Sequence, residues 1–477
     1  MTRRFLFTLI SICIYAGFMS AQVSSDLLQV TGQRLIGKTL NGENVREVHG
    51  NVIMTQGNIR ITCDSAVQFL ANNTADLMGH VVVTQDSILI KTDRGFYYGD
   101  TKVAYSTSGI WLTDKHFQLT SQNGYYYFNE KKSDFAVNVK MVDSLSTLLA
   151  NRLFYFNDEN KGIAFGNVQV RDTASTLFTD SLVFYRKSKT SHAFNNVRVY
   201  DPKNHLALFG DRLENIDSLK YSKITGQPFM VKIDTTADGK LDTLFISSRE
   251  MESIGDSSKK LIATDSVKIL RGDFSSVNGQ TFYFQQGDKL EIFKREKDER
   301  APVIWNDQTQ LVGDSIDIFL KKNRLDWIDV RANASIINID KDSLFRYDQI
   351  SGKNLKLFFG ENGLERTEVE GNVLSIYYLY EKDQPNGLLK SSAERAKIFF
   401  KDKKVNDVKL YGKPVSEYHP ENLIEGKEKD FTIPTFRLYK NKPVKREMLA
   451  ARKNLLYYLE KEEKYYAGKP DSSKRRP

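Results

Sequence analysis

The stretch GNVIMTQGNIRITCDSAVQFLANNTADLMGHVVV, residues 50–83, decides the fold because it holds one repeat unit and the start of the next. It opens on Gly50-Asn51-Val52, alternates apolar and polar residues up to Asp64, passes through the run ending at Phe69, and returns to Gly79-His80-Val81. Alternation with β-branched residues is typical of a strand. Gly, Asn and Asp tolerate the left-handed backbone of tight turns. One unit therefore predicts two strands and the turns between them.

The same landmarks recur along the chain. The opening landmark starts at intervals of 29, 30, 28, 29, 29 and 31 residues, at Gly50, Gly79, Gly109, Val137, Gly166, Asn195 and Gly226. A second landmark follows the first five after 14 residues, at Asp64, Asp93, Asn123, Asn151 and Asp180. The pattern weakens beyond residue 225 but returns at Glu370-Gly371-Asn372-Val373. Residues 30–411 are thus expected to be nearly all β.

Short strands at regular spacing also occur in propellers and β-sandwiches. Propeller blades need about 40 to 50 residues, and sandwich domains have no internal repeat of this length. A period near 29 instead favours a quasi-one-dimensional stack in which each unit contacts its neighbours. We therefore expect an elongated all-β solenoid or twisted β-jelly roll, about 100 Å long if each of some twelve units adds two rungs of about 4.8 Å.

The repeat resembles the OstA-like family, the periplasmic lipopolysaccharide-transport proteins of the LptA type. The resemblance rests on the Gly-Asn-Val start, the alternating strand and the Asp before an aromatic strand, and it covers residues 45–225 well and 260–415 loosely. It implies a V-shaped β-jelly roll that carries acyl chains in an apolar groove and stacks by edge strands onto other OstA-like jelly-roll domains, those of the inner-membrane transporter and the outer-membrane translocon. The chain is far longer than a single bridge protomer of the family.

Alternation assigns one set of apolar side chains to the inner face of the folded sheet. An apolar trough suits an acyl chain because burial is non-directional and contributes about 0.8 kcal/mol per methylene. A closed core has the same pattern, so both interpretations stay open here. The candidate groove positions are Val52, Met54, Ile59, Ile61, Phe69, Val81, Val83, Ile88, Ile90, Val168, Val170 and Leu177.

Signals of catalysis, metal binding and cofactor binding are weak. Asp-Ser dipeptides recur throughout the body, as turn residues do and a catalytic pair does not. The six histidines lack zinc-ligand spacing, and no phosphate-binding glycine loop follows a strand. Asp234, Asp238, Gly239 and Asp242 fit a calcium loop only in part, so a hairpin turn is the better interpretation. We expect no enzyme and no cofactor.

The N-terminus has the layout of a cleavable signal peptide. Arg3 and Arg4 precede an apolar run over residues 5–18, and Ala21 stands at the candidate cleavage point. An uncleaved anchor is the alternative, but the run is shorter than the ~20 residues that span a membrane. We expect removal of residues 1–21, a soluble or peripherally membrane-associated mature protein in the periplasm, and a single remaining cysteine, Cys63, which cannot form an internal disulfide.

The net charge of +9 lies at the two ends of the chain. Arg3 and Arg4 contribute two charges, and residues 439–477, with 12 Lys/Arg and 5 Asp/Glu, contribute seven, so residues 22–438 are neutral. A neutral body argues against a nucleic-acid partner. The end of the chain predicts an amphipathic helix over residues 448–466 and a basic tail. The expected divisions are residues 1–21, 22–225, 226–418 and 419–477.

Three functions remain open from sequence. The leading one is a non-enzymatic periplasmic bridge that carries lipopolysaccharide through an apolar β-groove to the outer membrane. The second is a structural, adhesive or polysaccharide-binding solenoid that transports no lipid. The third, a β-solenoid polysaccharide lyase or hydrolase, needs one coil with clustered charged residues, and the sequence singles out no such coil.

Overall fold

The structure is a computed structural model. It describes residues 27–235, 241–257, 259–284, 289–296, 299–321, 324–339, 345–361, 363–382, 384–401 and 404–450. The predicted signal peptide, most of the predicted C-terminal helix and the basic tail lie outside these residues. The described residues fall into two units, one of residues up to 115 together with 125–130, and one of residues 116–124 together with those from 131 onward.

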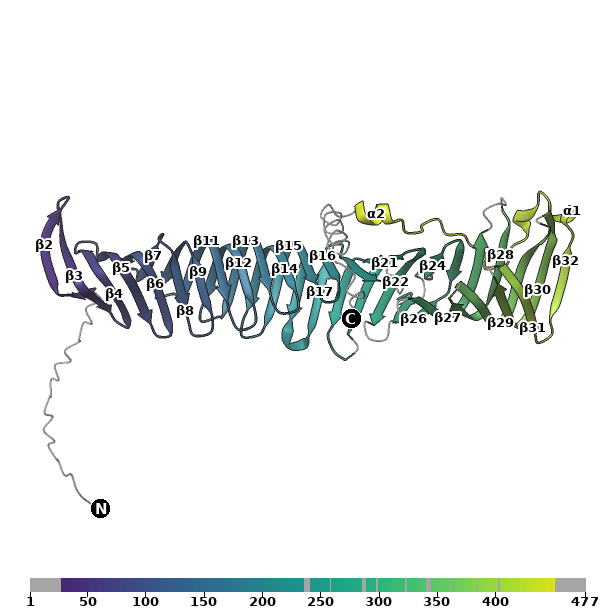
Figure 1. The fold of residues 1–477 in the computed structure, drawn as a ribbon, viewed down its shortest axis with the longest axis horizontal. Helices are drawn as coiled ribbons and strands as arrows, with labels where there is room; N and C mark the ends of the chain where they lie inside the picture. Colours follow the sequence, from purple (N-terminus) through teal and green to yellow (C-terminus); the bar gives the residue numbers. More distant parts are fainter. Residues whose placement is uncertain are drawn as a thin grey trace, which may run out of the picture. The chain divides into compact units, whose positions relative to one another are not determined.

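Both units consist almost entirely of antiparallel strands, which confirms the all-β prediction (Figure 1). The strands of the first unit are β1 (Gln29–Thr31), β2 (Arg34–Leu40), β3 (Glu43–Gln56), β4 (Ile59–Phe69), β5 (Thr74–Gln85), β6 (Ile88–Tyr98), β7 (Val103–Ser106), β8 (Ile110–Thr113) and the end of β10 (Asn123–Tyr127).

The second unit follows the same scheme with more strands. They are β9 (Gln118–Ser121), β11 (Lys132–Val142), β12 (Thr147–Phe156), β13 (Lys161–Arg171), β14 (Thr176–Tyr185), β15 (Thr190–Asp201), β16 (Leu206–Ile216), β17 (Tyr221–Thr225), β18 (Phe229–Thr235), β19 (Leu241–Ser247), β20 (Glu250–Ile254), β21 (Lys260–Arg271), β22 (Phe274–Phe284), β23 (Lys289–Phe293), β24 (Val303–Asn306), β25 (Thr309–Val312), β26 (Ser315–Lys321), β27 (Arg324–Ile339), β28 (Tyr347–Gly360), β29 (Gly363–Glu381), β30 (Gln384–Lys401), β31 (Lys404–Tyr411) and β32 (Val415–His419). The short helices are η1 (Asp217–Leu219), α1 (Glu421–Ile424), η2 (Glu428–Asp430) and α2 (Lys445–Ala450).

The repeated sequence landmarks form the corner at which each strand bends. In β3, Gly50 and Asn51 have φ of 74° and 47°, and the two residues together face the single residue Asp64 of β4. The corresponding pairs in β5, β11, β13 and β15 also have positive φ and face Asp93, Asn151, Asp180 and Asp211. Two residues against one are a β-bulge, which bends a strand pair sharply. The 29-residue period is therefore one outward and one returning strand, each crossing the corner once.

The corner divides the strands of each unit into two half-sheets. In the second unit, half-sheet A consists of the strand parts between the corners and the turns of residues 157–160 and 186–189. Half-sheet B consists of the strand parts between the corners and the connections of residues 143–146 and 172–175. Side chains reach across from one half-sheet to the other. Phe117, just before β9, packs edge-on against Tyr155 of β12 with ring centroids 5.0 Å apart. The core of each unit is thus the layer between its own two half-sheets.

The strands β18 and β19 pair as a hairpin, as predicted for the region that fits a calcium loop only in part. Asp234 of β18 faces Asp242 of β19 in the antiparallel register, which agrees with the turn interpretation, while Asp238 and Gly239 lie outside the described residues. Cys63 is a buried free cysteine. Burial raises the pKa of its thiol to about 11, so this side chain stays protonated and behaves as a small apolar residue at neutral pH.

A segment that the repeat pattern did not predict runs back over half-sheet B of the second unit. We call residues 425–444, between α1 and α2, the strap (Figure 1). The Gln349 amide donates to the Phe431 carbonyl (3.1 Å) and accepts from the Ile433 N–H (3.0 Å). Gln310 holds the strap further along in the same way, through the Arg437 carbonyl (2.7 Å) and the Tyr439 N–H (2.9 Å). Each glutamine side chain thus makes the hydrogen bonds to the strap backbone that a neighbouring strand would otherwise make.

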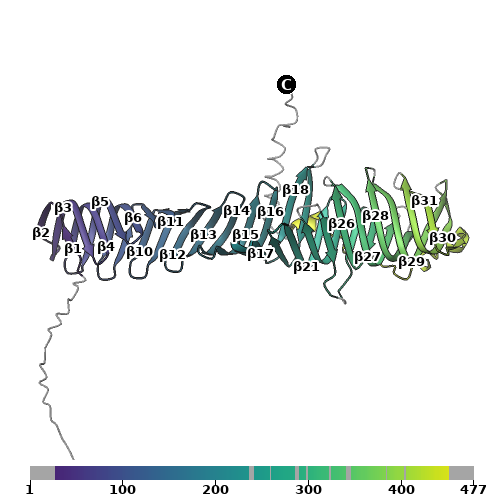
Figure 2. The same cartoon turned by 90° about the horizontal axis from the view of Figure 1, so that it is seen from below.

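The strap ends in α2, whose apolar side chains complete a core cluster on the outer face of half-sheet B. Met448 and Leu449 are 5% and 8% exposed and join Phe209, Phe229 and Phe245. Figure 2 shows α2 beside this part of the sheet. The predicted C-terminal helix therefore begins at Lys445, and its residues from 451 onward lie outside the described residues. The divisions expected near residues 225 and 418 stay predictions.

Candidate functional site

In the first unit the predicted groove positions form a closed core. Eight of them are 6% exposed or less: Val52, Met54, Ile59, Ile61, Val81, Val83, Ile88 and Ile90. A polar contact joins the half-sheets beside them, since the Tyr97 hydroxyl donates to the Gln56 side-chain oxygen (2.6 Å) and the Gln56 amide donates to the Gly99 carbonyl (3.0 Å). All three groups lie within one unit, and they close its inner layer.

Phe69 corrects the sequence prediction. It is half-buried and alternates with the buried Ala66 and Gln68, so it lies on the outer face of β4. The reason is the corner at Asp64, where the direction of alternation reverses: Ile59, Ile61 and Cys63 point inward before it, and even-numbered residues point inward after it. Strict alternation carried across the bulge therefore assigns Phe69 to the wrong face.

In the second unit, one row of inward-facing side chains changes from buried to half-buried and back to buried from strand to strand. Directly paired residues of half-sheet B form this row in the order Leu119, Met141, Leu148, Val170, Leu177, Val199, Leu208 and Met230. The first three are 0%, 4% and 6% exposed and Met230 is 0% exposed, whereas the four between them are half-buried. The predicted positions Val170 and Leu177 belong to these four, while Val168, nearer the corner, is 1% exposed.

The facing row of half-sheet A changes at the same strands. Tyr155 is 1% exposed, but Phe184, Ser191, Asn215 and Ser222 are half-buried. We call Val170, Leu177, Val199, Leu208 and Phe184 together the inner stretch. Its side chains are apolar, and Ser222 donates to the Asn215 side-chain oxygen (2.7 Å) at its margin. Both inner faces are therefore less completely covered over β13–β17 than on either side.

A charged cluster marks the end of the inner stretch. Lys232 of half-sheet B donates to the Tyr283 hydroxyl of half-sheet A (3.1 Å) and pairs with Asp234 (3.2 Å). Arg271 contacts Asp234 and Asp242. Burial lowers the pKa of Lys232, but Tyr283 and Asp234 outweigh it, so this pKa lies above its ordinary value. A cation that stays charged thus joins the two half-sheets where Met230 closes the row.

Sequence reasoning missed Val199, Leu208 and Phe184. Val199 follows Val170 by 29 residues, so the period itself could have found it. Phe184 lies against Gly162 so closely that a Cβ at Gly162 would overlap its ring. That contact carries no sequence signal beyond a glycine in a strand.

The chemistry of the inner stretch is that of apolar burial. Among the described residues, no group of three or more His, Cys, Asp or Glu side chains is arranged to hold a metal ion. The helices within the same residues are too short or too polar to cross a membrane. The inner stretch offers apolar surface with hydroxyl and amide groups at its edge, which suits a hydrocarbon chain.

Comparison with protein families agrees with this arrangement. The model of the OstA-like protein family matches residues 31–116 and 150–242. The chain is similar to the OstA-like family over these two segments. The first segment covers most strands of the first unit, and the second covers all five residues of the inner stretch. No curated protein matches the chain.

Proposed function

We propose that the chain is a non-enzymatic carrier that binds the acyl chains of lipopolysaccharide along the inner stretch and passes the lipid across the periplasm toward the outer membrane. The observation that carries the proposal is the row from Leu148 to Met230, where four apolar side chains are half-buried between fully buried ones. Burying a hydrocarbon chain against them would contribute about 0.8 kcal/mol per methylene. The similarity to the OstA-like family supports the same class of ligand.

The export route is part of this proposal. The layout of residues 1–21, which is typical of a signal peptide, supports export to the periplasm, between the two membranes that such a carrier serves.

Edge strands offer a route for partners. In the first unit β2 is largely exposed, with Leu35 at 52%. In the second unit β32 is exposed, with Val415 at 58% and Tyr418 at 52%. An unpaired strand edge can take up a further strand from another protein. We propose that other OstA-like domains pair with these edges.

A structural role is the second candidate, and it is favoured by the closed core of the first unit. Side chains such as Met54 and Ile61 are 0% exposed, as in a structural solenoid that transports no lipid.

The substitution Leu177→Asp tests the proposed function. It places a carboxylate on the inner stretch, and we expect it to weaken lipopolysaccharide binding by the purified chain at least tenfold, because a charge facing a hydrocarbon chain is desolvated without a partner. Phe165→Asp, on the outer face of the neighbouring strand and 43% exposed, is the matched control and should leave binding unchanged. Titration with labelled lipopolysaccharide measures both. Unchanged binding in a folded Leu177→Asp variant would contradict the proposal.

A further inference from the structure

The outer face of half-sheet B in the second unit carries cations without acidic partners over β11–β15. Lys140 and Arg171 are exposed, and Arg198 lies over the Phe178 ring at 5.3 Å. Among the described residues no carboxylate pairs with any of the three, and the Arg198 Nε has no hydrogen-bond partner. The side chains that alternate with them on this face are Thr147, Leu149, Gln169, Thr176, Phe178 and Tyr200, which are all uncharged.

The outer face of half-sheet A in the same unit shows the opposite arrangement. Arg152 pairs with Asp134 at 2.7 Å, Arg331 with Asp317 at 2.9 Å and with Asp329 at 3.0 Å, and Lys397 with Glu368 at 3.0 Å. Cross-strand ion pairs are thus common on that face. Unpaired cations on half-sheet B are therefore a local feature of this part of the chain.

The acidic residues nearest to these cations are engaged elsewhere. Each connection at the end of half-sheet B begins with an aspartate that caps it: Asp143 accepts from the N–H groups of Leu145 and Ser146, and Asp172 accepts from those of Ala174 and Ser175. These carboxylates fix the turns.

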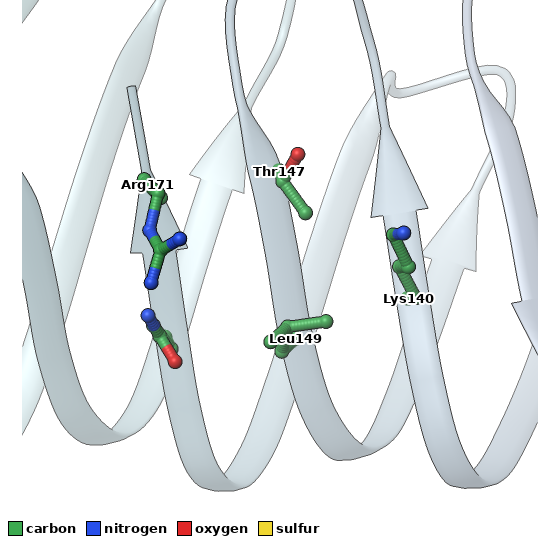
Figure 3. A pocket seen from close by; sticks show the side chains of 5 residues that line it. Lys140, Thr147, Leu149 and Arg171 are labelled. Atoms are coloured by element: carbon green, nitrogen blue, oxygen red, sulfur yellow. The ribbon is translucent and has the colours of Figure 1, made fainter. Parts of the chain in front are cut away.

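Two of the cations flank a shallow depression of about 310 Å³. It is lined by Lys140 of β11, by Thr147 and Leu149 of β12, and by Gln169 and Arg171 of β13. Figure 3 shows Lys140 and Arg171 on either side of the strand that carries Thr147 and Leu149. A pair of cations, a hydroxyl, an amide and a 38% exposed leucine make up a set of groups that suits a phosphorylated sugar.

The depression and the inner stretch lie at the same strand ends. Val170 points inward and Arg171, the next residue, points outward, and both precede the connection of residues 172–175. An amphiphile with an acyl chain on Val170 and Leu177 could therefore bend over this connection and place its headgroup beside Arg171.

The chain's own C-terminal residues are a poor occupant of this site. The strap and α2 cover the outer face only as far as Phe209 and Tyr200. Residues 451–477 hold eight Lys/Arg and four Asp/Glu, so they are repelled by a cationic surface.

We infer that the depression between Lys140 and Arg171 binds the phosphorylated sugar headgroup of the lipid whose acyl chains lie on the inner stretch. This inference rests on the proposed function and adds to it the place and the chemistry of headgroup recognition. The two cations neutralise the phosphate, Thr147 and Gln169 hydrogen-bond to sugar hydroxyls, and Leu149 packs against the sugar ring.

The test compares the full chain with a Lys140→Gln and Arg171→Gln double variant in equilibrium titrations with lipopolysaccharide and with the same lipid after chemical dephosphorylation. We expect the wild type to prefer the phosphorylated lipid by roughly tenfold, and the double variant to lose this preference while it binds the dephosphorylated lipid as the wild type does. The preference should shrink at high salt because the cations are exposed.

Lys187→Gln with Lys356→Gln removes the same charge from exposed positions outside the depression and should keep the preference. Equal binding of both lipids by the wild type would overturn the inference and leave the proposed function standing, whereas binding of neither lipid would overturn both. The titrations are repeated with inorganic pyrophosphate at the same concentration as the lipid. If pyrophosphate abolishes the preference of the wild type for the phosphorylated lipid, the depression is a general phosphate site, and the inference is overturned.

Discussion

Replacing Gly79 by alanine should lower the free energy of unfolding by roughly 2 to 5 kcal/mol, partly through its positive φ and partly through crowding at the corner. Gly79 has a φ of 72°, which costs an L-residue about 1 to 2 kcal/mol. A Cβ there would also overlap the Asp64 side chain, and overpacking adds about 1 to 3 kcal/mol. The exposed Asp64 carboxylate can rotate away, but the Asp64 Cβ also lies 3.0 Å from the added atom, so rotation of the side chain alone does not relieve the crowding.

Gly57→Ala is the matched control for this prediction. Gly57 also has a positive φ, 58°, but a Cβ there meets nothing within 4 Å. Gly57 lies in the same unit as Gly79. Its replacement by alanine should lower the free energy of unfolding only by the about 1 to 2 kcal/mol that a positive φ costs an L-residue. Chemical denaturation followed by circular dichroism measures both variants. Equal losses would show that crowding by Asp64 does not hold the corner.

Replacing both Met448 and Leu449 by aspartate should release the strap and increase protease cleavage within residues 431–444 at least tenfold. The two side chains are buried against Phe209, Phe229 and Phe245, and each contributes about 1.5 to 3 kcal/mol by burial. Cleavage follows the population of the detached strap when opening and closing are fast. The substituted residues lie in α2 and in no strand, so the β body should keep its circular dichroism spectrum.

Val444→Asp tests whether the effect belongs to the cluster. Val444 lies just before α2 and is 50% exposed, so its replacement should leave the cleavage rate within about twofold of the wild type. Limited proteolysis with mass spectrometry identifies the cut sites. An unchanged rate in the double variant would mean that α2 does not hold the strap.

The sequence predicted the repeat because the same local requirement recurs at each corner. A pair such as Gly166-Asn167 must adopt positive φ, and an Asn or Asp must face it, so both leave a periodic trace. In the second half Gly371-Asn372 keeps the landmark, but two other corners are Asp265-Ser266 and Ala332-Asn333, whose φ values are also positive. These residues do not match the Gly-Asn landmark, because several residue types can occupy a corner once packing holds it.

The candidate site was only partly predictable. Val170 and Leu177 were assigned to the inner face by alternation, which also assigned Phe69, where the corner reverses the direction. Alternation cannot separate Val168, which is 1% exposed, from the half-buried Val170, because exposure depends on how far the half-sheets cover each other. The strap was not predictable either, since Gln310 and Gln349 hold it by contacts more than 80 residues apart in the chain.

Photo-crosslinking in intact cells tests the central claim most directly. Benzoylphenylalanine at Leu177 of β14 or Val199 of β15 places the reactive group on the inner stretch, and at Phe165 it places the group on the outer face of the neighbouring strand β13. The account predicts lipopolysaccharide adducts from positions 177 and 199 and none above background from position 165. Absence of a lipid adduct from both inner positions in a folded, exported chain, or equal adducts from position 165, would contradict it.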